Sequence, residues 1–165
     1  AGRKVAYVGD GNNVCHSLML LCAKLGVNFS AATPQGYEPE SSFVTAAQAE
    51  ASISGSTVEI TTDARAAVAN ADAVYSDVWT SMGQEEESAK RLQVFPPYQI
   101  NAELMSAARP DAIVLHCLPA HRGEEITHEV FEAQQQPIFD QAENRLHAQK
   151  AVLVWLMDIQ QLRTF

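Results

Sequence analysis

The sequence has few cysteines, few basic residues and no long apolar run. Only three of its 165 residues are cysteines. These thiols, Cys15, Cys22 and Cys117, form no Cys-x-x-Cys pair and are odd in number. That pattern argues against a disulfide framework and predicts reduced thiols, so we expect a cytoplasmic protein.

The scarcity of basic residues restricts the possible partners. The 11 Lys and Arg residues are scattered and the formal charge is −9, which disfavours nucleic acid as a partner. The densest apolar run covers residues 151–157, far fewer than the roughly 20 residues that cross a bilayer. We therefore expect no membrane association. The five histidines show no His-Glu-x-x-His spacing, so no metal site is predicted.

Short apolar runs alternate with helical patterns along the whole chain, which is typical of βαβ units and a parallel sheet. The expected strands are Val5–Val8, Phe29–Ala32, Val58–Ile60, Ala73–Tyr75 and Ile113–Leu115. A chain of this length fits one domain. The predicted fold is α/β, a Rossmann-like three-layer αβα domain with a mainly parallel sheet.

The clearest helix follows the first strand, with Asn12 or Gly11 as its cap and Gly26 at its end. Its expected buried stripe is Val14, Leu18, Leu21, Cys22 and Leu25, with Cys15 off that stripe. Further helices are expected at Phe43–Ser52, Ala64–Asn70, Glu87–Val94 and Ala102–Ala107, the last capped by Asn101.

The last expected helix, roughly Gln141–Gln160, is apolar on every side over residues 151–157, whereas a surface helix shows one apolar stripe. Two interpretations remain open. Either this helix is central to the domain core, or the chain, which starts directly at a strand, is one domain of a longer protein that covers the helix.

The segment Gly9–Val14 links the first strand to the first helix, where backbone N–H groups can receive an anion. It half-matches the dinucleotide fingerprint, but Val14 replaces the third glycine and the end of the second strand, Thr33–Gly36, offers no acidic residue for a ribose. A nicotinamide site is therefore disfavoured. The amides of Asn12 and Asn13 suit a small zwitterion, and a structural turn role for one of them is the alternative.

Polar groups also follow the later strands. Asp77 ends the fourth strand and precedes a Gly-hinged loop, so it could hold an ammonium group or simply cap a turn. Cys117 ends the fifth strand, where it could be a site residue or a small buried hydrophobe. Leu118-Pro119 is a candidate cis peptide. Arg145 offers a guanidinium for an oxyanion, with a surface salt bridge as the alternative.

The order of four motifs resembles the ornithine carbamoyltransferase family over essentially the whole chain. These motifs are Gly-Asp-Gly-Asn-Asn, Asp-Val-Trp-Thr-Ser-Met-Gly, His-Cys-Leu-Pro and Glu-Asn-Arg. The Ser-Met-Gly loop resembles the element that separates ornithine enzymes from aspartate enzymes. The resemblance implies that L-ornithine is bound by Asn13, Asp77, Ser81 and Met82, with Asp77 on its α-ammonium group.

The same resemblance implies that Cys117 and Arg145 are catalytic and that the Leu118 carbonyl faces the carbamoyl group. The implied reaction converts carbamoyl phosphate and L-ornithine into citrulline and phosphate, a step of arginine biosynthesis. It needs no cofactor and no metal. Catalysis would come from positioning the amine and stabilising an oxyanion.

Two family motifs, Ser-x-Arg-Thr-Arg and His-Pro-x-Gln, do not occur in this sequence. We therefore expect residues 1–165 to be the ornithine-binding domain, without the amino-terminal carbamoyl phosphate domain and inactive alone. The resemblance implies a homotrimer, or a multiple of it, for the full-length protein, whereas the isolated chain is expected to be a monomer or to associate nonspecifically. The alternatives are a carbamoyltransferase for another amine, such as aspartate or putrescine, a non-catalytic nucleotide-binding module, and an interaction domain.

Overall fold

A computed structural model describes residues 2–81, 83 and 85–162 of the chain. It contains a five-stranded, all-parallel sheet in the order β3-β2-β1-β4-β5. The strands are β1 (Lys4–Val8), β2 (Asn28–Ala32), β3 (Val58–Thr61), β4 (Ala73–Ser76) and β5 (Ile113–His116). The sequence prediction is confirmed for all five, and each observed strand is one residue longer than its apolar run.

The helices follow the predicted order with different bounds. They are α1 (Asn13–Lys24), α2 (Ser41–Ser54), α3 (Ala64–Val68), α4 (Ser88–Val94), α5 (Ala102–Met105), α6 (His128–Ala133) and α7 (Gln135–Leu162), with 3-10 turns η1 (Glu85–Glu87) and η2 (Pro96–Tyr98). Asn101 caps α5 as predicted, because its side chain accepts the Leu104 N–H. The short helix α6 was not predicted, and α7 begins six residues earlier than expected.

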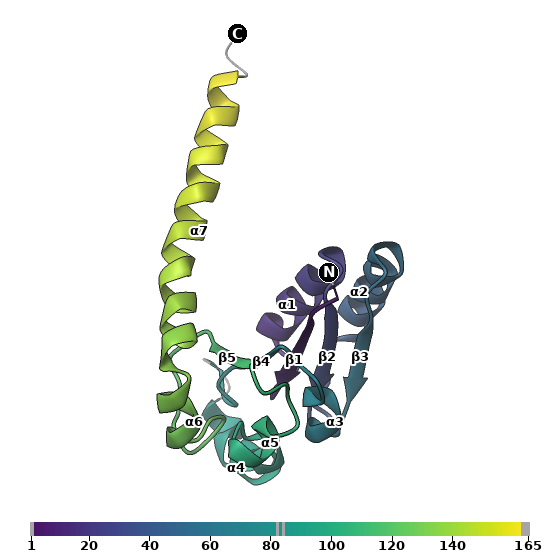
Figure 1. Cartoon of the computed structure of the whole chain (residues 1–165), viewed down its shortest axis with the longest axis vertical. Helices are drawn as coiled ribbons and strands as arrows, with labels where there is room; N and C mark the ends of the chain where they lie inside the picture. Colours follow the sequence, from purple (N-terminus) through teal and green to yellow (C-terminus); the bar gives the residue numbers. More distant parts are fainter. Residues whose placement is uncertain (1, 82, 84, 163–165) are drawn as a thin grey trace.

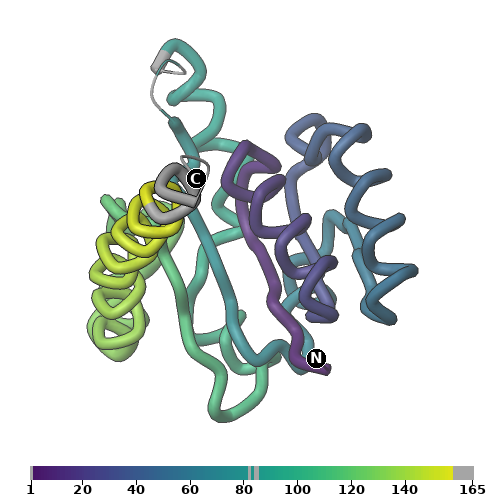
Figure 2. Tube along the Cα trace, turned by 90° about the horizontal axis from the view of Figure 1, so that it is seen from above, coloured from purple at the N-terminus to yellow at the C-terminus, as the bar shows by residue number. Residues whose placement is uncertain are grey.

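Helices cover both faces of the sheet, which confirms the three-layer prediction. On one face, α1 and α2 lie side by side and pack on Tyr7, Phe29 and Tyr75 (Figures 1 and 2). On the other face, α3, α5 and α6 pack on Ala6 and Val8. Successive β1 residues therefore point to opposite layers, as the pleat of a strand requires. The sheet is buried from both sides and holds its edge loops in fixed positions.

The expected stripe of α1 is confirmed for Cys22, which is buried, and for Val14 and Leu18, which pack on the core, but it was wrong for its other two leucines. Leu21 and Leu25 are 53% and 62% exposed, whereas Cys15 and Met19 are fully buried. The helix begins at its predicted cap, because the Asn12 side chain accepts the backbone N–H groups of both Val14 and Cys15. Both sides of α1 are partly apolar, so the packing against β1 and α2, rather than the spacing of leucines, decides which side is buried.

Helix α7 packs against β5 near its start and then projects beyond the body of the domain (Figure 1). Its apolar segment, Val152–Met157, has side chains that are 46% to 64% exposed. The interpretation that this segment is central to the domain core was therefore wrong. Within the described part of the chain, no helix has both the length and the apolar character that a membrane crossing requires.

Gly11 is required where the loop after β1 meets the segment after β2. Its N–H donates to the Tyr37 carbonyl at 2.9 Å. A Cβ atom at this position would lie 2.3 Å from the Pro39 nitrogen, closer than any real contact. The residue is therefore a glycine because two backbone segments touch there, a reason distinct from phosphate binding.

Candidate functional site

The candidate site lies at the carboxyl edge of the sheet, where β1 and β4 are neighbours although β2 and β3 come between them in sequence. In open parallel sheets the crevice for ligands forms at this point of the topology. The loops that begin at Gly9, Asp77 and Cys117 all leave the sheet at this edge. The three strand-end motifs of the sequence therefore meet in space.

Asp77 is the centre of the hydrogen bonds at this edge. Its Oδ1 accepts the thiol of Cys117 at 2.9 Å and the N–H of Val78 at 2.8 Å. Its Oδ2 accepts a hydrogen bond from the Asn12 side-chain NH₂ group at 3.0 Å. This bond joins the loop after β1 to the loop after β4. Asp77 is 8% exposed. The structure thus brings Asp77 and Cys117 together as expected, and it adds Asn12, for which sequence analysis preferred its neighbour Asn13.

Cys117 and Arg145 line one cavity of about 320 Å³ together with Val14, Tyr75, Gln141 and Ala142. Arg145 is an exposed residue about three turns from the start of α7, because the helix begins at Gln135 and not near Gln141 as expected. Asn13 lines an adjoining cavity of about 300 Å³, to which Tyr75 also contributes. Tyr75 and Gln141 were not predicted. The one sequence signal for Tyr75 is that it stands two residues before Asp77, since alternate residues of a strand point to the same face.

The environment of Cys117 keeps its sulfur protonated. Burial, together with the hydrogen bond and the negative charge of Asp77, raises the pKa of the Cys117 thiol to about 12. Burial raises the pKa of Cys22 to about 11 and that of Cys15 further. All three cysteines are free. At neutral pH Cys117 is therefore a neutral hydrogen-bonding group, and covalent catalysis by a thiolate is not favoured.

The turn after β5 is fixed by two buried side chains. The Leu118-Pro119 peptide is cis, as predicted, and Leu118 has a left-handed φ of 57°. His116 Nδ1 accepts the Leu118 N–H at 2.9 Å, and its Nε2 lies 3.2 Å from Glu125 Oε1. Glu125 Oε1 also accepts the His121 N–H at 2.6 Å. The fully buried Glu125 therefore holds both ends of the turn that presents Cys117 and Leu118.

His121, Glu124 and Glu125 are the one group among the described residues whose side chains gather as metal ligands do, within 4.8 Å of one another. Glu125 is already bonded to the backbone of His121, and His121 Nδ1 lies 3.7 Å from Glu124 Oε2. We assign these contacts to the support of the turn. The sequence expectation of no metal site stays a prediction.

The loop after β4 is anchored by Arg91 of α4. Arg91 donates to Asp10 Oδ2 and to the Trp79 carbonyl, both at 2.7 Å, and its side chain is 5% exposed. Trp79 is 2% exposed and packs on Phe95. Burial raises the pKa of Asp10, and the ion pair with Arg91 opposes that shift. The anchor joins the β1 loop to the loop after β4.

The predicted ornithine loop continues from this anchor. Ser81 is half-buried. Met82 lies outside the described residues, so its predicted role in substrate binding stays a prediction. Gly83 lines a cavity of about 600 Å³ with Asp10, Tyr37 and Arg91. This cavity shares no lining residue with the cavity of Cys117 and Arg145.

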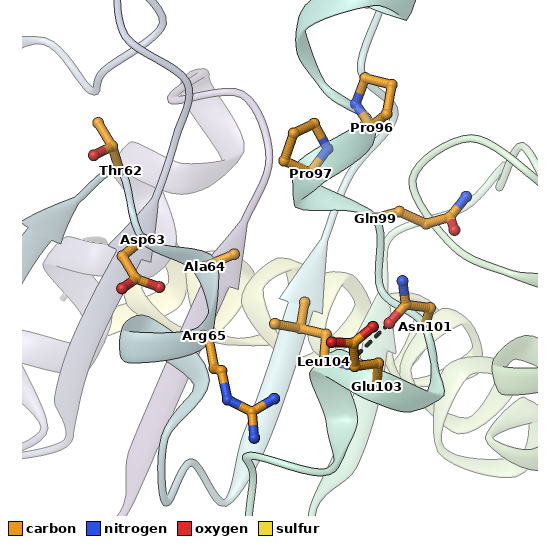
Figure 3. A pocket seen from close by; sticks show the side chains of 10 residues that line it. All are labelled: Thr62, Asp63, Ala64, Arg65, Pro96, Pro97, Gln99, Asn101, Glu103 and Leu104. Carbon is orange, nitrogen blue, oxygen red and sulfur yellow. Dashed lines mark hydrogen bonds between the residues drawn. The ribbon is translucent and has the colours of Figure 1, made fainter.

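A further cavity, of about 560 Å³, lies on the face of the sheet that α3 and α5 cover (Figure 3). It is bordered by the start of α3, by the prolines of η2 and by α5, and the dashed bond in the figure is the cap from Asn101 to the Leu104 N–H. Its lining includes none of the candidate substrate-binding or catalytic residues predicted from the sequence. The Cys117 cavity is smaller, but it holds the convergent polar groups and is the stronger candidate.

A family model described as the Asp/Orn-binding domain of aspartate/ornithine carbamoyltransferase matches residues 1–156. The chain belongs to this family. It is 57% identical over 156 residues to the ornithine carbamoyltransferase of Carboxydothermus hydrogenoformans, covering 94% of this chain and 50% of that protein. The carbamoyltransferase family resemblance drawn from the four motifs is confirmed.

Solved structures agree with this carbamoyltransferase assignment. The ornithine carbamoyltransferase of Gloeobacter violaceus matches with a TM-score of 0.85 and 54% identity, over 93% of this chain and 50% of that one. The anabolic enzyme of Campylobacter jejuni matches with a TM-score of 0.91 and 40% identity, over 94% of this chain and 52% of that one. The chain spans about half the length of the curated relatives it matches.

Proposed function

We propose that this chain is the ornithine-binding half of an ornithine carbamoyltransferase of arginine metabolism. The observation that carries the proposal is the hydrogen bond from Cys117 to Asp77 beside the cavity that Cys117 shares with Arg145, in a fold whose relatives bear that name. In this role residues 1–165 form one amino-acid-binding domain. The substrates are L-ornithine and carbamoyl phosphate, and the products are citrulline and phosphate.

Each residue has a distinct part in the proposed reaction. Asp77 keeps free lone pairs beside its three accepted bonds and receives the α-ammonium group of ornithine, with Asn13, Ser81 and Met82 around the amino acid. The δ-amine attacks the carbonyl carbon of carbamoyl phosphate only when deprotonated, and a free primary amine is mostly protonated near neutral pH. The neutral thiol of Cys117 adds no negative charge that would favour the ammonium form.

The oxyanion formed by this attack needs a positive partner and a fixed place. Arg145 supplies the guanidinium from α7, and the Leu118 carbonyl contacts the carbamoyl NH₂ group. The turn held by Glu125 keeps that carbonyl in position. Catalysis in this proposal is positioning and charge stabilisation, without a covalent enzyme intermediate.

We further propose that the exposed segment Val152–Met157 is covered by the half of the protein that the relatives possess beyond this chain. Six consecutive side chains that are about half exposed or more form an apolar surface, and such surfaces mark interaction sites. The three free cysteines support a cytoplasmic location. The full-length protein is proposed to be a homotrimer or a multiple of it.

An enzymatic test joins this chain to the amino-terminal half of the Bacillus subtilis relative, to which it is 57% identical over 152 residues. We expect citrulline formation from L-ornithine and carbamoyl phosphate by the fused protein, and none by this chain alone. The tryptophan emission should also shift to the blue on fusion, because Trp155 is 62% exposed here whereas Trp79 is already buried.

The control is the Bacillus subtilis enzyme cut and rejoined at the same point. Turnover by the isolated chain, or a fused protein that prefers aspartate or putrescine, would contradict the proposal. So would an inactive fusion whose rejoined control is active.

A further inference from the structure

The hydroxyl of Tyr75 lies next to the sulfur of Cys117 because of the sheet register. Tyr75 of β4 pairs with Leu115 of β5, so the two side chains stand on the same face. Two residues further along, Asp77 and Cys117 follow on that face and are bonded to each other at 2.9 Å. Tyr75 and Cys117 line the same cavity. The tyrosine therefore lines the cavity beside the thiol.

Gln141 of α7 determines the direction of the Tyr75 hydroxyl. Its Oε1 accepts the backbone N–H of His116 at 3.0 Å, which leaves its NH₂ group to face the tyrosine. Its Nε2 donates to Tyr75 Oη at 3.0 Å. Since the hydroxyl oxygen accepts this bond, its own proton is free for another acceptor. Burial raises the pKa of Tyr75, so the hydroxyl keeps that proton.

The sulfur of Cys117, which lines the same cavity, is the acceptor that this inference assigns to the proton. The bond from Tyr75 lowers the pKa of the Cys117 thiol, against the larger opposing effects of burial and Asp77. A sulfur that accepts from one side donates its own proton on the other, and Asp77 is the acceptor there. Asp77, in the loop after β4, is thus bonded to the thiol, and Tyr75 of β4 and Arg145 of α7 line the cavity that Cys117 borders.

We propose that Tyr75 and Gln141 are positioning residues that orient Cys117 as a donor to Asp77. The inference rests on the proposed function, because it explains how the amino-acid site is kept in one hydrogen-bonded state. Gln141 also lies one helical turn before Arg145, so both side chains project from the same side of α7. The same amide that bonds to Tyr75 also ties this side of α7 to the end of β5, through the His116 N–H.

The test is the rate at which iodoacetamide alkylates Cys117 between pH 7 and pH 9, mapped by mass spectrometry, in Tyr75→Phe and Gln141→Leu. Losing a donor raises the thiol pKa and reduces the thiolate fraction, while the remaining thiolate becomes more nucleophilic. We expect alkylation about threefold slower in both variants, the net of these two effects for a shift of about one pKa unit. A thiol unconnected to Tyr75 would show no change.

Tyr98→Phe is the matched control, because the Tyr98 hydroxyl donates to the Thr62 carbonyl on the other side of the sheet. Rates in Tyr75→Phe and Gln141→Leu that equal those of Tyr98→Phe would overturn the inference. If Tyr75→Phe does not fold, Gln141→Leu, which keeps the tyrosine, decides alone. Alkylation needs no ornithine, so a failure of ornithine binding with slowed alkylation would remove the proposed function and leave this inference standing.

Discussion

Replacing Asp77 by Asn should lower kcat/KM for ornithine roughly 30- to 150-fold in the fused enzyme. The carboxylate is the proposed partner of the α-ammonium group, and a hydrogen bond to a charged group contributes about 2 to 3 kcal/mol. The amide that replaces it carries no negative charge and places an NH₂ group beside the donors Asn12 and Cys117. Steady-state kinetics with varied ornithine measure the effect.

Asp111→Asn is the control for this prediction, because Asp111 is an exposed carboxylate paired with Arg109 before β5. It should leave kcat/KM unchanged. Amide dispersion in an NMR spectrum shows that Asp77→Asn is folded. A folded Asp77→Asn enzyme with the kinetics of Asp111→Asn would remove Asp77 from the substrate site.

Replacing Arg91 by Met should cost about 3 to 5 kcal/mol of unfolding free energy, the range found when one partner of a buried ion pair is removed. The variant leaves Asp10 in a buried position without its partner and deprives the Trp79 carbonyl of a donor. Urea unfolding followed by circular dichroism measures the loss. Lys90→Met, at an exposed neighbouring position, should change the midpoint little, and equal midpoints for the two variants would contradict this account of the anchor.

The loss should also depend on pH in a defined direction. Burial already raises the pKa of Asp10, and without Arg91 nothing of comparable size opposes that shift. The folded variant then binds a proton more readily than the unfolded chain, so its stability rises as the pH falls through the raised pKa. The difference between wild type and Arg91→Met should therefore be largest near neutral pH and smaller in acid.

The strands could be predicted from the sequence because each is a short, continuous apolar run between turn residues, the pattern of a strand buried on both faces. The helices were less certain. In α1 the spacing favoured Leu21 and Leu25, yet both are exposed and Cys15 is buried. A helix with apolar residues on two sides gives no sequence signal for the side that meets the sheet. That choice is made by tertiary packing.

At the candidate site, too, local sequence patterns predicted some residues, whereas others depend on tertiary contacts. Asp77 and Cys117 could be predicted because both stand at strand ends, where topology brings residues together. The bond from Asn12 to Asp77 and the roles of Tyr75 and Gln141 could not be predicted, because they depend on which bonds cross between strands and onto α7. Of the two interpretations left open for the last helix, the exposure of its apolar segment agrees with the one in which another part of a longer protein covers it.

The most direct test of the ornithine-binding assignment is an amide chemical-shift titration of the ¹⁵N-labelled chain with L-ornithine, with L-aspartate and NAD as separate controls. The account predicts shifts with ornithine alone, centred on Asn12, Asn13, Asp77 and Cys117. Shifts with NAD at Gly9–Val14, or equal shifts with aspartate, would contradict it. A spectrum that none of the three compounds changes would contradict the claim that this chain carries the amino-acid site by itself.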